Sequence, residues 1–162
     1  MATAFTLPEQ AKIVQAMNLA TDAAGRAGAY VTCKGAFKAY VVFQITQGNA
    51  ATILLSINQA TAVAGTAAKA IVGNARWWVN ADCAATDTLV RQADGVSFTT
   101  DAGVKNKIVV AEIDLSSLDV AGGFDCIAGV TGASNVANLT GATYWLTPLR
   151  YGAATPPSAV VD

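Results

Sequence analysis

Carboxylates are the abundant groups in this sequence that could carry acid–base chemistry, because none of its 162 residues is a histidine. Glu112 and Asp114 are two positions apart, so on a β-strand they would share one face, with Asp125 on a neighbouring strand. Two carboxylates about 5–10 Å apart across a cleft are the arrangement that glycoside hydrolysis needs. A simpler interpretation is that Glu112 and Asp114 lie on a solvated face at a strand end, beside Lys105 and Lys107. We therefore predict no catalytic residue and no enzyme activity.

Three aspartates in expected loops offer the oxygen ligands that calcium prefers. Asp82, Asp87 and Asp101 do not have the D-x-D-x-D-G spacing of a calcium loop, however. The absence of histidine also removes the usual zinc ligands and the Ser-His-Asp and Cys-His arrangements of many hydrolases. We predict neither a metal ion nor a cofactor.

The three cysteines, Cys33, Cys83 and Cys126, are odd in number and far apart, with no C-x-x-C pair. We expect free, largely buried thiols in a chain that is made in a reducing cytoplasm.

The first lysine is Lys12, so the start lacks the basic region of a secretory signal. No apolar stretch approaches the roughly 18 residues that span a bilayer. We expect no membrane partner.

Charged residues are scarce, at 13% of the chain against about 25% in an average soluble domain. Ten Lys and Arg against eleven Asp and Glu give a formal net charge of -1. Binding to nucleic acid depends largely on an excess of positive charge that neutralises phosphates. The composition therefore argues against nucleic acid as a partner.

Large aromatic residues are the strongest candidates for contact with a protein partner. Trp77 and Trp78 are neighbours, and neighbours in a strand point to opposite faces, so one of the two must face away from the core. Trp145 and Tyr151 lie in the last expected strand, and each of them also either packs in the core or faces a partner. Tryptophan is enriched at the centres of protein interfaces. Stacking on a sugar ring is the alternative use of an exposed tryptophan, although few polar groups adjoin these residues in the sequence.

The elements that must position these residues are short strands. Alternation of apolar and polar residues with a period of two recurs from residue 29 onward, and turn residues such as Gln47-Gly48-Asn49 and Asp94-Gly95 separate the runs. The pattern predicts two hairpins, 37–46 with 52–58 and 88–92 with 96–100. Further strands are expected at 76–81, 107–114, 124–131 and 143–151.

Seven or eight short strands without a long helix favour an all-β fold, an antiparallel β-sandwich of the jelly-roll kind. We expect a single sandwich domain over residues 29–152. Residues 1–28 are expected to form an N-terminal arm, in which Leu7-Pro8-Glu9-Gln10 opens a short helix through Met17 and the residues after it show no clear period. Residues 153–162, which contain Pro156-Pro157, are expected to form an extended tail.

Four stretches carry a resemblance to a known class of protein: QGNAAT at 47–52, ATAVAG at 60–65, FDC at 124–126 and YWLTPLRY at 144–151. They resemble small virion proteins of tailed bacteriophages, of the head decoration or cement type. The resemblance implies a structural protein on the outside of the capsid, made in the host cytoplasm, that reinforces contacts between copies of the major capsid protein. It also implies a homo-oligomer, with a trimer as one candidate.

Two other classes remain open. A tail, fibre or receptor-binding subunit of a phage would share this composition and differ only in its position in the particle. A carbohydrate-binding module or small hydrolase built on a β-sandwich is the other, which a screen against glycans would identify.

Overall fold

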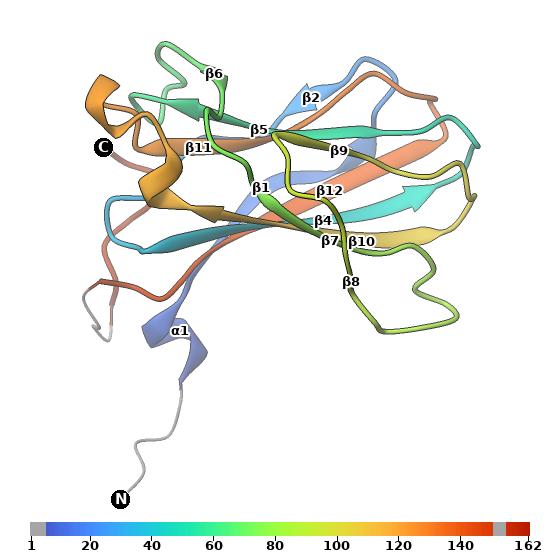
Figure 1. Cartoon of the computed structure of the whole chain (residues 1–162), viewed down its shortest axis with the longest axis horizontal. Helices are drawn as coiled ribbons and strands as arrows, with labels where there is room; N and C mark the ends of the chain where they lie inside the picture. Colours follow the sequence, from blue (N-terminus) through green and yellow to red (C-terminus); the bar gives the residue numbers. More distant parts are fainter. Residues whose placement is uncertain (1–5, 151–154) are drawn as a thin grey trace, which may run out of the picture.

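A computed structural model of the chain describes residues 6–150 and 155–162. One four-residue helix, twelve strands and two short 3-10 turns make up its elements (Figure 1). They are α1 (Leu7–Gln10), β1 (Lys12–Thr21), β2 (Arg26–Ala27), β3 (Val31–Thr32), β4 (Lys38–Gln47), β5 (Leu54–Ala60), β6 (Lys69–Ala70), β7 (Arg76–Asn80), β8 (Val90–Arg91), β9 (Ser97–Thr99), β10 (Asn106–Asp114), η1 (Leu115–Ser117), η2 (Val120–Gly122), β11 (Cys126–Thr131) and β12 (Asn138–Leu146). Among the described residues, no helix has the length and apolar composition that crossing a membrane requires.

The strands form two antiparallel sheets that face each other, which confirms the predicted all-β sandwich (Figure 1). Sheet A has the order β1-β12-β4-β10-β7-β8, and sheet B has the order β2-β11-β5-β6, with β3 also on β11 and β9 also on β5. The chain crosses repeatedly between the sheets, from β1 to β2, from β4 to β5 and from β9 through β10 and β11 to β12, and the first and last strands are neighbours in sheet A. This is jelly-roll connectivity.

The core lies between the sheets and follows from the period of two. In β4, the side chains of Val41, Phe43 and Ile45 are buried, while those between them face out of the sandwich. The Tyr144 hydroxyl joins the two layers, because it donates to the Ala29 carbonyl at 2.8 Å and accepts from the Gly129 N–H at 3.0 Å. A buried phenol with both bonds satisfied fixes the spacing of the layers.

The two predicted hairpins do not form. β4 belongs to sheet A and β5 to sheet B, and β8 and β9 are divided in the same way. Each expected turn is instead a crossing between the two sheets. The buried Gln47 amide fixes the first crossing by donating to the Ala51 and Asp101 carbonyls at 3.2 and 2.8 Å.

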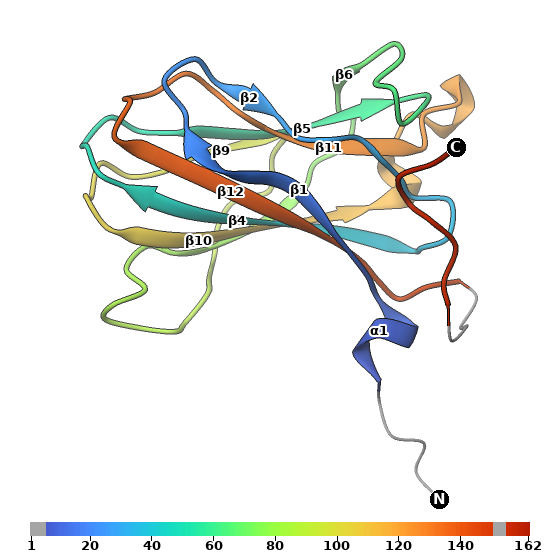
Figure 2. The same cartoon turned by 180° about the vertical axis from the view of Figure 1, so that it is seen from behind.

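Residues 12–28 differ from the expected arm. β1 pairs along sheet A with β12, and β2 pairs with β11 in sheet B (Figure 2). Two register shifts, between Gln15 and Met17 and between Met17 and Ala20, break the period of two that would have marked the strand. The extra residues of β-bulges interrupt alternation in this way.

The expected tail also contacts the body. Ala159 is only 5% exposed, and its carbonyl accepts a hydrogen bond from the Thr32 N–H at 2.8 Å.

All three cysteines lie in the described part of the chain and are free, as predicted. Cys33 and Cys126 are buried, whereas Cys83 is half-buried.

Candidate partner interface

Trp77 belongs to the core. Its side chain is fully buried, its ring stacks on Phe98 with centroids 5.9 Å apart, and its indole N–H donates to the Gly95 carbonyl at 2.9 Å. An indole with this packing and a satisfied N–H cannot reach a partner. Of the two adjacent tryptophans, Trp78 is therefore the one that faces outward, on the far side of sheet A.

Trp78 is half-buried on that outer face and stands opposite Arg91 of β8. The Arg91 guanidinium lies 4.6 Å from the centre of the Trp78 ring, in a cation–π contact. One side of the ring is thus covered within the chain. This leaves less of the ring for stacking on a sugar.

Trp145 also faces outward, from β12, and is half-buried. It stands opposite Tyr40 of β4, and its indole N–H donates to the Thr143 hydroxyl at 3.2 Å. Because Thr143 is two residues back on the same face, this bond directs the indole along the strand. The fourth candidate contact residue, Tyr151, lies outside the described residues.

The outward tryptophans belong to a larger surface. Val42 of β4 stands opposite Val110 of β10, which stands opposite Trp78. In the next row, Tyr40 stands opposite Trp145, which stands opposite Ile13 of β1, a side chain that is 45% exposed. We call these two rows the apolar stripe: Ile13, Tyr40, Val42, Val110, Trp78 and Trp145.

Sequence reasoning had singled out only the two tryptophans of this stripe. Val42 and Val110 were detectable as apolar residues at positions that alternate with core residues, which means that both faces of β4 and β10 carry apolar side chains. A strand with one solvated face would have polar residues there. Ile13 could not be found in this way, because β1 itself was not expected.

A compact charged group borders the stripe. The Oε1 atom of Glu112 accepts from the Lys38 ammonium at 2.6 Å and from the Arg76 guanidinium at 2.7 Å. Burial acts to raise the pKa of Glu112, but the hydrogen bonds from these two cations outweigh it and lower the pKa below its usual value. The carboxylate therefore stays ionised and neutralised within the face, which does not suit a general acid.

The other candidate carboxylates do not converge with Glu112. Asp114 is the cap of η1 and accepts from the Ser116 N–H and hydroxyl, and these bonds lower its pKa. Asp125 precedes β11 in sheet B and lies 3.3 Å from the Lys34 ammonium. The geometry provides no pair of carboxylates across a cleft among these three residues.

The loop aspartates that were considered as calcium ligands are also separated. Asp82 forms an ion pair with Lys105, and Asp101 lies 2.8 Å from the buried Lys107 ammonium. No cluster of three or more potential metal-binding side chains occurs within residues 6–150 and 155–162. The hydrogen bonds from Lys105 to Asp82 and from Lys107 to Asp101 lower the pKa of both carboxyls and favour their ionised state.

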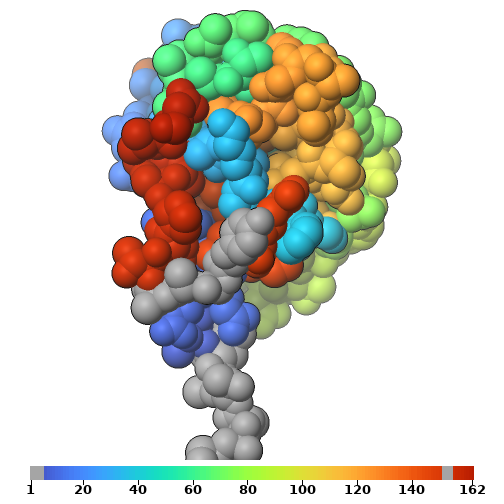
Figure 3. Space-filling view, turned by 90° about the vertical axis from the view of Figure 1, so that its left-hand side faces the viewer, coloured from blue at the N-terminus to red at the C-terminus, as the bar shows by residue number. Residues whose placement is uncertain are grey.

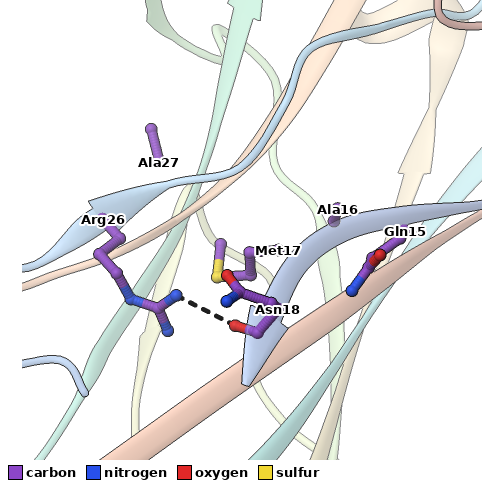
Figure 4. Close-up of a pocket in the computed structure, with 6 residues that line it drawn as sticks. All are labelled: Gln15, Ala16, Met17, Asn18, Arg26 and Ala27. Atoms are coloured by element: carbon purple, nitrogen blue, oxygen red, sulfur yellow. Dashed lines mark hydrogen bonds between the residues drawn. The ribbon is translucent and has the colours of Figure 1, made fainter. Parts of the chain in front are cut away.

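A hollow of about 580 Å³ opens at the side of the sandwich, between β1 and β2 (Figure 4). Its most polar side chain is Arg26, whose guanidinium donates to the Asn18 and Ala20 carbonyls at 3.1 and 2.9 Å and to Asp22 at 3.2 Å. These bonds engage the two terminal nitrogens of the guanidinium inside the protein, whereas its buried Nε has no partner among the described residues. Arg26 therefore links the edges of the two sheets rather than offering a site for a ligand.

Comparison with known proteins finds a likeness in fold. No protein-family model matches the chain, and no curated protein sequence matches it. Among solved structures, the SPBc2 prophage-derived protein YomS superposes with a TM-score of 0.51 at 10% sequence identity. The match covers 90% of this chain and 99% of that one. The two proteins share the β-sandwich architecture.

Proposed function

We propose that this chain is a structural subunit of a bacteriophage particle, a decoration or cement protein that binds the major capsid protein on the outside of the shell. The apolar stripe on sheet A carries the proposal. A stable protein contact needs at least about 1,000 Å² in total with a few aromatic anchors near its centre. Trp78, Tyr40 and Trp145 supply such anchors on one face.

The composition of that face supports a permanent contact rather than a transient one. At the border the Glu112 carboxylate pairs with both Lys38 and Arg76, so this anion already has its partners and the three residues together carry a net charge of +1. The likeness in fold to a prophage-derived protein adds support from an independent direction. In this role the protein is not an enzyme, is made in the host cytoplasm, and acts as a homo-oligomer on the capsid surface.

The test is sedimentation of the purified protein with capsids that lack it. Val42→Lys places a charge in the middle of the stripe, and Thr46→Lys places the same charge on the same face of β4, at an exposed position outside the stripe. We expect Val42→Lys to weaken binding by at least about 30-fold, the equivalent of about 2 kcal/mol at an interface centre. Thr46→Lys should bind as the unaltered protein does.

Two results would count against this proposal. Equal binding by both variants would remove the stripe from the interface. Binding to purified tails in place of heads would move the protein to the alternative structural role, as a tail or fibre subunit.

A further inference from the structure

We propose that a small pocket beside the apolar stripe accepts a basic side chain of the partner, a lysine or an arginine. The pocket extends the face described under the proposed function, on which this inference rests. It adds one feature of the partner that the apolar stripe does not specify, a positive charge at a defined place.

A loop forms a wall at the β7–β8 edge of sheet A. Residues 81–89 connect β7 to β8 and project beyond sheet A on the side away from sheet B (Figures 1 and 2). The Asn80 amide donates to the Thr86 carbonyl at 2.6 Å, and its oxygen accepts from the Asp82 N–H at 3.0 Å. These bonds fix the shape of the loop within the chain, so the wall is already formed when a partner arrives.

The pocket lies between this loop and the outer face of sheet A, and its volume is about 240 Å³. Ile108 contributes to it from β10, two residues before Val110 of the apolar stripe and on the same face of the strand. The pocket is therefore continuous with the stripe. Pockets for small-molecule ligands usually have about 300–1,000 Å³, so this one suits a single side chain. Its lining residues are Asn80, Cys83, Thr86, Asp87, Leu89 and Ile108.

Asp87 gives the pocket its charge, since the other lining residues are uncharged. The sequence has eleven Asp and Glu residues, and within residues 6–150 and 155–162 ten of their side chains have a hydrogen bond or an ion pair. Asp87 is the exception in this described part of the chain. Asp82 of the same loop, by contrast, pairs with Lys105. A single carboxylate without a counter-ion makes the pocket complementary to a cation.

The apolar part of the lining favours a cation on a long stem. Leu89 is 43% exposed and Ile108 is half-buried, so both can contact methylene groups of an incoming side chain. Lysine and arginine lay their stems along apolar surface while the charged end reaches a polar group, here Asp87. We therefore expect the partner to carry a lysine or an arginine next to the apolar residues that cover Val110 and Trp78.

The test is sedimentation with capsids that lack the protein. Asp87→Lys brings two positive charges together in the pocket and should weaken binding by at least about 10-fold. Asp162→Lys is the matched control, because it makes the same change of net charge in residues 155–162, at the end of the sandwich that Figure 3 shows. It should bind as the unaltered protein does. Both residues are exposed, so neither variant should change the melting temperature appreciably.

Salt supplies a second readout, which an altered loop shape alone would not give. Asp87→Asn keeps the shape of the side chain and removes its charge. Raising the ionic strength from about 0.1 to 1 M shortens the Debye length from about 10 to 3 Å and weakens ion pairs. Over this range, binding of the unaltered protein should fall more steeply than binding of Asp87→Asn. Asp87→Glu retains the charge and should keep the steeper dependence.

The outcomes separate this inference from the proposed function. Full-strength binding by Asp87→Lys with weak binding by Val42→Lys would overturn the pocket and leave the apolar stripe as the interface. Weak binding by Asp87→Lys with full-strength binding by Val42→Lys would support the pocket and remove the stripe. Full-strength binding by both variants would overturn both proposals. Equal salt dependence of Asp87→Asn and the unaltered protein would also overturn the pocket.

Discussion

The Asp22 carboxylate accepts a hydrogen bond from the Thr131 hydroxyl at 2.9 Å, inside the protein and between the two sheets. Thr131 belongs to β11 of sheet B, and the hydroxyl of Thr140 on β12 of sheet A bonds to the other oxygen of the same carboxylate. Arg26 forms an ion pair with the same carboxylate. The fully buried negative charge of Asp22 is therefore balanced by a cation and accepts two hydroxyl hydrogen bonds. Asp22 therefore connects the sheets at the end where β1 leaves sheet A.

Replacement of Asp22 by alanine should destabilise the fold by about 3–5 kcal/mol, because it leaves the Arg26 charge without its partner and two buried hydroxyls without an acceptor. Urea denaturation followed by fluorescence measures the change. Asp87→Ala is the control, since Asp87 is exposed, and it should stay within about 0.5 kcal/mol of the unaltered protein. Equal stability of the two variants would contradict the role of Asp22.

The two adjacent tryptophans should separate stability from binding. Trp77→Ala empties a fully buried position and should cost about 3–5 kcal/mol of unfolding free energy. Trp78→Ala should change stability much less and should weaken capsid binding by at least about 30-fold. Thermal melting beside capsid sedimentation distinguishes them. A large loss of stability in Trp78→Ala with full binding would reverse the assignment.

Stability should fall in acid partly through Glu112. Its pKa is lower in the folded state than the ordinary 4.5, so its contribution is complete above that value and is lost as the pH falls through the folded pKa. Below a pH of about 4.5, the unfolding free energy of Glu112→Gln should change less with pH than that of the unaltered protein, because the variant lacks the carboxyl that takes up the proton. Denaturant titrations between neutral and acid pH measure the slope. An unchanged slope would mean that the ion pairs with Lys38 and Arg76 contribute nothing.

The three thiols should react in two classes. Burial raises the pKa of Cys33 well above its usual value and that of Cys126 to about 12, so neither forms a thiolate near neutral pH. The half-buried Cys83 should react first in the native protein with a thiol reagent at pH 8, and the other two only after unfolding. Cys83→Ser should abolish the fast phase. Fast labelling of all three in the native state would contradict the buried positions.

The sequence alone was sufficient for several properties. Alternation identified β4, β10 and β11 as strands, and from them the all-β class. It also required Trp77 and Trp78 to face opposite sides. Spacing and odd number indicated free cysteines. Each of these depends on neighbours along the chain, which any single sequence displays.

Only the tertiary structure decided which strands are neighbours, which tryptophan is buried and that β1 completes sheet A. Backbone hydrogen bonds between strands are chemically the same for almost every residue, so the sequence of β4 does not specify β10 and β12 as its partners. A period of two assigns a side chain to one of two faces and does not say which face meets the core. In β1, bulges remove even that signal. The apolar stripe depends on all three decisions, because it is made of outward residues from five strands that come together only in the folded sheet.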